Sequence, residues 1–308
     1  MKRGAVFGLL VLYVVWGSTY LAIRFGLESI PPFAMSGLRY ASAGAILLAA
    51  AKAMGAPRVA ARDLVPAFTC GALLLLCGNG GVVWAEQRIS SGLAALLIAI
   101  EPLFIVLLRA LPPERHAPGG RALFGVALGL SGVALLLGPS RLGGEHIDLL
   151  GAAVVLFAAL TWALGSLLSR RFAPSESPFQ ATALQMLAGG ALLLAASLAT
   201  GEWGRFSPAH VSVRSWAALL YLLVFGSLVG YTVYMWLLRV ADPSRVSTYA
   251  FVNPVVAVFL GWALAGETVS PRTLVAAAVI VAAVVLITLP ESGSSSAASP
   301  VIRRGLKK

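Results

Sequence analysis

The sequence predicts an all-α membrane protein whose ten transmembrane helices form two inverted five-helix repeats. Its composition is the first observation, since 59% of the 308 residues are hydrophobic and 11% are charged, whereas soluble domains carry about 25% charged residues. Second, the apolar residues fall in runs of roughly 20, long enough to cross a hydrocarbon core. Third, the second half of the chain repeats features of the first half.

The apolar runs are continuous, and they do not alternate between apolar and polar residues. In lipid the backbone must satisfy its own hydrogen bonds, which leaves helices or a closed barrel, and continuous runs of this length indicate helices. We expect membrane helices at 5–27, 33–54, 64–85, 90–111, 121–139, 148–169, 178–200, 214–238, 245–265 and 270–290.

The distribution of Lys and Arg predicts that both termini are cytoplasmic. Numbered from a cytoplasmic N-terminus, the cytoplasmic side holds sixteen Lys and Arg residues, the opposite side holds six, and Arg39 lies within a span. This bias is the one that the positive-inside rule describes. The net charge of +11 therefore reflects membrane topology, and we expect no nucleic-acid partner. We expect the basic tail 291–308 to be disordered and to touch anionic lipid headgroups.

An internal repeat divides the chain into residues 1–139 and residues 148–290. Trp16 and Trp162 are 146 residues apart, and Glu101-Pro102 and Asn253-Pro254 are 152 apart. Each unit holds five predicted spans, so the second unit would enter the membrane with the opposite polarity. Inverted repeats of this kind are a transporter architecture, with the substrate site near the midplane between the repeats.

Aromatic and polar residues share helix faces in the middle of several predicted spans. Aromatic stripes also occur in lipid belts and in cores, but mid-span aromatics beside polar groups favour the lining of a cavity. The predicted substrate cavity has the residues Trp16, Tyr20, Asn79, Glu101, Trp162, Tyr231, Tyr234, Tyr249 and Asn253.

Arg39 and Glu101 are charged residues that lie clearly inside predicted spans. Each costs about 2.5–3.5 kcal/mol on insertion scales, and such residues usually face a bundle interior or water. Two interpretations stay open. Arg39 and Glu101 form a structural ion pair, or they take part in transport, with Glu101 binding and releasing a coupling proton.

Pro102 and Pro254 occupy equivalent positions in the two units. Each proline removes a backbone donor and frees a carbonyl group one turn earlier. Breaks near the midplane can build binding sites or gates in transporters, and they can also be plain kinks. We assign Arg39, Pro102 and Pro254 structural or gating roles.

Four segments resemble a known family of transporters. These segments are VLYVVWGSTYLAIRFGLESIPPFAMSGLRYASAG, CGNGGVVWAEQRISSGLAALL, TWALGSLLSRR and STYAFVNPVVAVFLGWALAGETVS. They resemble the EamA-type family of the drug/metabolite transporter superfamily, in its YedA-like branch, over residues 6–290. Gly266-Glu267 is typical of this family, whereas the equivalent turn in the first half, Pro112-Pro113-Glu114, lacks the glycine. The resemblance implies two inverted EamA repeats and the export of small metabolites.

The sequence contains few features that would indicate an enzyme. His116, His146 and His210 all fall in loops, and no metalloprotease or P-loop motif is present, so we expect no catalytic residue, cofactor or metal. We therefore predict a multi-pass transporter of the bacterial inner membrane that exports amino acids or drug-like compounds by alternating access, as a monomer or a homodimer. A nucleotide-sugar or lipid-precursor carrier and a non-transporting sensor or scaffold are the alternatives.

Overall fold

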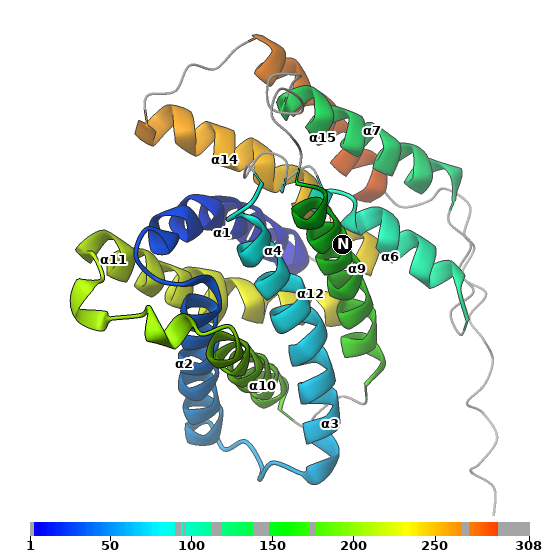
Figure 1. Ribbon diagram of the computed structural model, residues 1–308. Coiled ribbons are helices and arrows are strands. Elements are labelled where there is room, and N and C mark those ends of the chain that lie inside the picture. The colour runs from blue at the N-terminus through cyan, green and yellow to red at the C-terminus, as the bar shows by residue number, and fades with distance from the viewer. Residues whose placement is uncertain are drawn as a thin grey trace, which may run out of the picture.

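The computed structural model describes residues 3–89, 94, 97–112, 119–137, 148–172, 177–265 and 271–288, and every regular element within these ranges is a helix (Figure 1). The described part of the first half contains α1 (Arg3–Leu27), α2 (Pro32–Ala53), α3 (Ala61–Cys70), η1 (Gly71–Gly80), α4 (Gly81–Ala85), α6 (Glu101–Ala110) and α7 (Gly120–Leu137). The second half contains α9 (Leu149–Arg171), α10 (Pro178–Ala199), η2 (Glu202–Gly204), η3 (Pro208–His210), α11 (Val213–Tyr221), η4 (Leu222–Tyr231), α12 (Thr232–Val240), α13 (Pro243–Val246), α14 (Tyr249–Ala265) and α15 (Pro271–Thr288).

Six helical segments of the described residues are long and apolar enough to cross a membrane. They are Arg3–Leu27, Pro32–Ala53, Ala61–Ala85, Leu149–Arg171, Pro178–Ala199 and Val213–Val240, and shorter apolar helices cover Gly120–Leu135 and Leu274–Ile287. The predicted class of all-α membrane protein is thus confirmed.

The outer surfaces of these helices are apolar. Phe7 on α1 is 69% exposed, Val65 on α3 is also 69% exposed, and Leu149 at the start of α9 is 79% exposed. Large exposed apolar surfaces are rare on soluble monomers, whereas lipid tails solvate them. The exposed faces therefore match a lipid environment.

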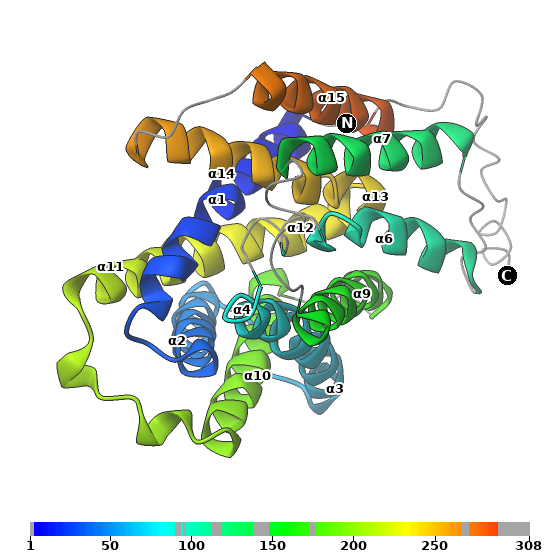
Figure 2. The same cartoon turned by 45° about the horizontal axis from the view of Figure 1, so that its top comes forward.

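The helices of the two halves pack in a reciprocal way. α2 packs mainly on α10, and α7 packs mainly on α15. α1 packs on α14 and on the run α11–η4–α12, while α9 packs on the run α3–η1–α4 and on α6. Each half therefore inserts its first helix between the later helices of the other half, and Figure 2 shows α1 lying beside α14 and α12.

Glycines allow α2 and α10 to approach closely. A Cβ atom on Gly190 would lie 2.5 Å from the backbone nitrogen of Ala41, and one on Gly44 would lie 2.8 Å from the backbone nitrogen of Leu187. Neither position has room for a side chain, which is the small-residue packing expected between membrane helices. Gly44 and Gly190 also hold equivalent positions in the sequence repeat.

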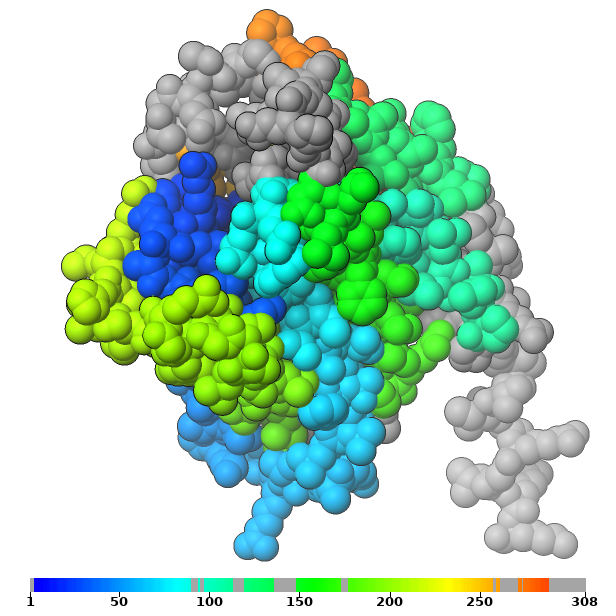
Figure 3. Space-filling model, in the orientation of Figure 1, coloured from blue at the N-terminus to red at the C-terminus, as the bar shows by residue number. Residues whose placement is uncertain are grey.

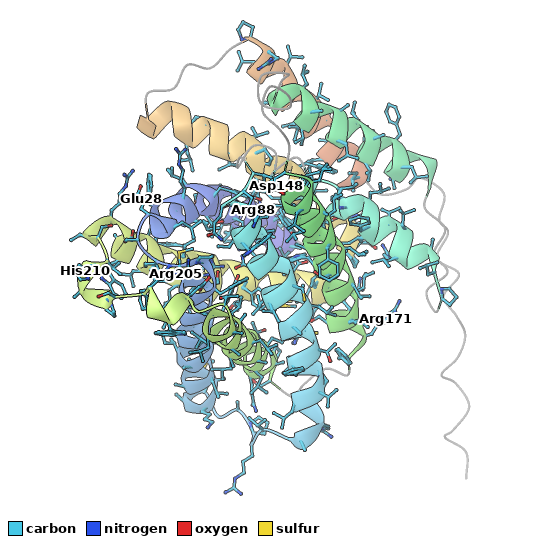
Figure 4. All side chains as sticks on the ribbon, in the orientation of Figure 1. Glu28, Arg88, Asp148, Arg171, Arg205 and His210 are labelled. Carbon is cyan, nitrogen blue, oxygen red and sulfur yellow. The ribbon has the colours of Figure 1, made fainter. Side chains whose placement is uncertain are left out.

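Polar contacts join the chain segments at one end of the bundle. Glu28 pairs with Arg214 at 3.2 Å, and the buried Glu202 accepts hydrogen bonds from the backbone N–H groups of Phe33 and Ala34 at the start of α2. Glu28, Arg205 and His210 lie at this end of the bundle (Figure 4). Arg171 lies away from them, at the C-terminal end of α9. The turn 28–31 and the connection 200–212 are therefore held together.

Arg88 and Asp148 form an ion pair at 3.0 Å at the start of α9 (Figure 4). The Asp148 carboxylate also caps α9 by accepting a hydrogen bond from the backbone N–H of Gly151. The Gly151 N–H first, and then Arg88, hold the pKa of Asp148 below its ordinary value. At the end of α6, Arg109 contacts both carboxylate oxygens of Asp242 at 2.8 Å.

Several predicted elements differ from the observed ones. The predicted helices 64–85 and 214–238 each contain a π-helical segment, at η1 and η4. The predicted helix 245–265 is broken, because α13 ends at Val246 and the Ser247 and Thr248 hydroxyls donate to carbonyl groups three residues earlier. Of the predicted helix 90–111, the structure describes residues 94 and 97–111, with α6 starting at Glu101. The Gly266-Glu267 turn and the tail 291–308 lie outside the described residues.

Candidate functional site

A cavity of about 100 Å³ lies among helices from both halves of the chain. Its walls come from α1, α2, the η1–α4 run, α6 and the residue Ile98 before it, α9 and α14. Helices of both halves meet on the face that Figure 3 shows, where α1 (blue), α4 (cyan) and α9 (green) lie side by side. The lining residues are Trp16, Thr19, Tyr20, Ile23, Arg39, Tyr40, Gly78, Asn79, Val82, Ile98, Glu101, Ala158, Ala159, Trp162, Tyr249 and Asn253.

The structure brings seven of the nine predicted cavity residues to this cavity. They are Trp16, Tyr20, Asn79, Glu101, Trp162, Tyr249 and Asn253. Tyr231 and Tyr234 are fully buried and are not among the lining residues. The Tyr234 hydroxyl accepts a hydrogen bond from the Trp162 indole at 2.9 Å, so Tyr234 supports a lining residue.

Two tryptophans from equivalent positions of the repeat form the aromatic part of the wall. The rings of Trp16 and Trp162 lie 5.6 Å apart at an angle of 76°, and Trp16 also packs edge-on against Tyr249 at 4.9 Å. Edge-to-face pairs of this kind are favourable and hold both rings in a defined orientation. The wall is therefore rigid and apolar, with hydroxyl and indole groups at defined points.

The π-helical segments supply groups to this site. Gly78 and Asn79 of η1 line the cavity. In η4, the Gly226 carbonyl accepts a hydrogen bond from the Trp16 indole at 3.2 Å, and the Ser227 hydroxyl accepts one from Arg39 at 2.8 Å. π-helical turns are rare and often occur at functional sites. Their two positions are equivalent in the two halves, and apolar periodicity carries no signal that separates them from an α-helix.

Arg39 reaches the cavity as a buried cation without an acidic partner among the described residues. Its side chain is 4% exposed. It donates to the hydroxyl groups of Ser227 and Tyr40, and its guanidinium group lies 4.3 Å from the centroid of the Tyr40 ring. Arg39 and Glu101 line the same cavity but are not joined by an ion pair, so of the two open interpretations the structure does not support the ion pair.

Several buried oxygen atoms around the cavity have no hydrogen-bond partner among the described residues. Both carboxyl oxygens of Glu101 are in this position, as are one amide oxygen each of Asn79 and Asn253 and Oε1 of Glu86. Buried polar groups are normally paired, and every one of these atoms is an acceptor. The cavity thus offers acceptors to a donor or a cation.

The two repeat prolines play different local roles. Pro102 lies in the first turn of α6, where its missing N–H costs nothing. Pro254 lies inside α14, one residue after the cavity-lining Asn253. Residues 97 and 98 are helical, residues 99 and 100 form a turn, and α6 then begins at Glu101, so the chain breaks directly before Pro102, whereas α14 continues through Pro254.

Apart from Arg39, the remaining lining residues are mostly small or aliphatic, together with one tyrosine, and none of them was predicted from the sequence. They include Thr19, Ile23, Tyr40, Val82, Ala158 and Ala159. Alanine and valine are so common in these helices that their composition carries no site signal. Tyr40 follows Arg39 directly, and that neighbourhood is the one signal that could have identified it.

Catalytic and metal-binding chemistry has little support among the described residues. They contain no group of three or more His, Cys, Asp or Glu side chains that could hold a metal ion. The arrangement can hold a small molecule between an aromatic wall, a guanidinium group and a set of oxygen acceptors.

Comparison with known proteins identifies the family. The sequence profile of the EamA-like transporter family matches the chain twice, over residues 3–138 and 149–289. The chain is 41% identical over 270 residues to the uncharacterized inner membrane transporter YedA of Escherichia coli (strain K12), covering 87% of this chain and 84% of the relative.

A more distant relative and a solved structure also match over most of this chain. The chain is 30% identical over 276 residues to a protein of Streptantibioticus cattleyicolor named as a probable terminal-alkyne amino-acid exporter, covering 89% of this chain and 90% of that one. It shares its fold with a solved structure at a TM-score of 0.77 and 22% identity, over 94% of this chain and 98% of the other. The chain therefore belongs to the EamA-like transporter family, and it is a transporter of the inner membrane and not an enzyme.

Proposed function

We propose that this protein exports small amino-acid-like or drug-like metabolites by alternating access through the cavity between its two halves. The observation that carries the proposal is that equivalent residues of the two halves line the same cavity. Trp16 and Trp162 are equivalent in the sequence repeat, as are Glu101 and Asn253, and all four line one cavity. In transporters built from inverted repeats, the substrate binds where the repeats meet.

The reciprocal helix packing supports two inverted units, residues 1–139 and 148–290, each with five membrane helices. Equivalent helices pair with each other, as α2 does with α10, and the first helix of each half packs among the later helices of the other. A pseudo-two-fold axis produces this pattern. Rocking of one unit against the other would open the cavity to each side in turn.

Ion pairs between connections agree with the predicted order of the spans, while the N-in, C-in orientation rests on the Lys and Arg bias. Glu28 and Arg214 both belong to connections predicted to face the periplasm, as do Arg88 and Asp148. Arg109 and Asp242 both belong to the predicted cytoplasmic side. Each pair joins residues that an even number of predicted spans separates, so both partners fall on the same side of the membrane.

The size of the cavity favours a small substrate over the alternative of a nucleotide sugar or a lipid precursor. This cavity of about 100 Å³ is smaller than the roughly 150 Å³ that holds one benzene molecule, so it must widen to take an amino acid and would have to widen much further for a nucleotide sugar. Arg39 at one part of the wall and the acceptors Glu101 and Asn253 at another suit a molecule with both an anionic and a cationic group.

Two relatives are named for amino-acid compounds. One is the terminal-alkyne amino-acid exporter described above, and the other is a probable amino-acid metabolite efflux pump of Escherichia coli (strain K12), 26% identical over 264 residues. These names agree with the cavity in favouring a small zwitterionic or cationic substrate. A sensor or scaffold without transport has no comparable support.

Transport by purified protein in liposomes tests the proposal. Radiolabelled amino acids and cationic drugs are offered with and without a pH gradient, and a nucleotide sugar serves as the competitor class. We expect saturable movement of at least one amino acid or cation that empty liposomes do not show. Movement of the nucleotide sugar alone would contradict the proposed substrate class.

A further inference from the structure

Arg39 and Trp16 are held at the cavity by two consecutive residues of η4. The Ser227 hydroxyl accepts a hydrogen bond from Nε of Arg39 at 2.8 Å, and the Gly226 carbonyl accepts one from the Trp16 indole at 3.2 Å. A Cβ atom on Gly226 would lie 3.9 Å from Cζ of Arg39, so glycine lets η4 approach the guanidinium group without covering it. The guanidinium group therefore lies close to the aromatic part of the wall.

The guanidinium group of Arg39 has more donors than its protein partners use. An arginine side chain carries five N–H groups. Nε donates to Ser227 and Nη2 donates to the Tyr40 hydroxyl, and the other three N–H groups donate to no group among the described residues. Two parallel N–H groups can bind one carboxylate with bidentate geometry. Arg39 lines the cavity, so it keeps enough donors there for a carboxylate.

The positive charge of Arg39 has no counter-charge in contact with it in the part of the chain that the structure describes. Its side chain is 4% exposed, and its contacts are the hydroxyl groups of Ser227 and Tyr40 and the Tyr40 ring. Glu101 lines the same cavity without forming an ion pair with Arg39. A buried charge is costly when nothing compensates it, so an anionic group in the cavity would supply the missing partner.

The equivalent position in the second half indicates that helix packing does not require this charge. Gln185 corresponds to Arg39 in the sequence repeat, and α10 packs on η1 as α2 packs on η4. The Gln185 amide oxygen accepts a hydrogen bond from the Tyr231 hydroxyl at 3.1 Å, and its NH2 group donates to the Ser169 hydroxyl at 3.5 Å. Gln185 is not among the lining residues. A neutral amide therefore serves the packing, and the charge occurs at the equivalent position that faces the cavity.

We propose that Arg39 selects substrates by their carboxylate group, which it binds through two parallel N–H groups. The inference rests on the proposed function and narrows it, because a drug-like cation without a carboxylate would lose this contact. The carboxylate would lie close to Trp16, and the acceptors Glu101 and Asn253 would be left for an ammonium group of the same molecule. An amide in place of the carboxylate offers one oxygen atom and no negative charge, so it would bind Arg39 less tightly.

A pair of small ligands tests the inference without any transport. Propionate and propionamide have nearly the same size and shape, but only propionate carries a negative charge. Purified protein in lipid nanodiscs is titrated with each ligand at constant ionic strength. Binding is followed by tryptophan fluorescence and by the thermal midpoint, which a bound ligand raises. We expect the wild type to bind propionate roughly tenfold more tightly than propionamide, since hydrogen bonds to charged groups are the stronger ones.

Arg39→Gln removes the charge and introduces the side chain that the second half carries at the equivalent position. This variant should bind propionate and propionamide with equal affinity. Arg24→Gln is the matched control, because Arg24 is exposed and is not among the lining residues, and it should keep the preference of the wild type.

Arg39→Lys carries the test if Arg39→Gln does not fold. Lysine keeps the charge but lacks the planar fork of donors, so the preference of Arg39→Lys for propionate should be smaller than that of the wild type. An unchanged preference in Arg39→Lys would contradict bidentate binding.

Two other results would overturn the inference. One is equal or absent binding of the two ligands by the wild type, and the other is a preference for propionate that survives in Arg39→Gln. Transport in liposomes is a separate measurement, so the two proposals fail separately. Amino-acid transport by a protein that lacks the preference would remove only the role of Arg39. A preference that depends on Arg39, in a protein that transports neither amino acids nor cations, would contradict only the proposed function.

Discussion

The indole rings of Trp16 and Trp162 meet edge to face in the cavity wall, with their centroids 5.6 Å apart. Each ring also has a second anchor, since the Trp16 indole donates to the Gly226 carbonyl and the Trp162 indole donates to the Tyr234 hydroxyl. The equivalent residues of the two halves therefore build one surface. A rocking motion of the halves would change the contact between these rings.

Replacing either tryptophan should weaken substrate binding and should also lower stability, because each ring packs on other rings of the wall. Contact with an aromatic ring contributes about 0.5–1.5 kcal/mol beyond the buried area, and for a bound substrate the upper end corresponds to roughly tenfold in affinity. We expect Trp16→Ala and Trp162→Ala to raise the half-saturating substrate concentration by about that factor in liposomes. Trp203→Ala changes a tryptophan that is 37% exposed and is not among the lining residues, and its transport should match the wild type.

Arg39→Leu separates a structural role from a transport role. The partners of Arg39 are neutral hydroxyl groups, and the described residues place no carboxylate against it. Its removal strands two hydroxyls, at about 1–3 kcal/mol each, but also removes the cost of a buried charge. We expect a thermal midpoint close to that of the wild type, measured by fluorescence size-exclusion chromatography, together with loss of transport. A well-folded Leu variant with full transport would show that Arg39 does not contact substrate.

The alanines of α9 limit the size of the substrate. Ala158 and Ala159 line the cavity, so Ala159→Leu would place a larger side chain in a space of about 100 Å³. Bulky substrates should be lost first and small ones last, measured as a change in the order of competitors. Ala153→Leu on the exposed side of the same helix is the matched control, and equal losses in both variants would argue against a size limit at this wall.

The helical membrane fold could be predicted from the sequence because lipid imposes one rule on every span. Long apolar runs must be helical, and the predicted limits of α2 and α10 lie within one residue of the observed ones. The π-helical segments and the break before α14 could not be predicted. They depend on tertiary contacts, such as the bond of Arg39 to Ser227, and on hydroxyl groups that compete with the backbone.

The site residues could be predicted where polar side chains lie inside apolar membrane spans. Glu101, Asn79 and Asn253 stand out because such residues are costly in a membrane, and all three line the cavity. The spacing of Tyr231 and Tyr234 in the sequence also predicts a helix face that lines the cavity, but in the structure packing buries both side chains fully. Which layer a tyrosine occupies depends on the neighbouring helices, and a single sequence does not contain that information.

Reporter fusions test the N-in, C-in topology. A periplasm-active reporter fused after Gly143 should be active, and one fused after Pro174 should be inactive, because one span separates the two positions. Both residues lie outside the described ranges, so the result is independent of the contacts described above. Activity at both positions, or at neither, would contradict the inverted repeats.

Glu101→Gln tests whether transport is coupled to protons. Glu101 is 1% exposed, it lines the cavity, and its carboxyl oxygens have no hydrogen-bond partner among the described residues. A substrate cation and a proton would compete for this group, one arriving from each side. Glutamine keeps the shape of the side chain but cannot bind or release the proton. Under antiport, the variant should still exchange substrate for substrate and should lose uphill movement driven by a pH gradient.

Glu28→Gln is the matched control for this experiment, because it removes an exposed carboxylate paired with Arg214 outside the cavity, and it should keep both activities. Facilitated diffusion gives a different pattern. The wild type would then ignore the gradient, and Glu101→Gln would transport as well as the wild type. Since the structure shows no ion pair between Glu101 and Arg39, that result would mean that Glu101 holds a proton permanently and serves the packing of α6 rather than the coupling of transport.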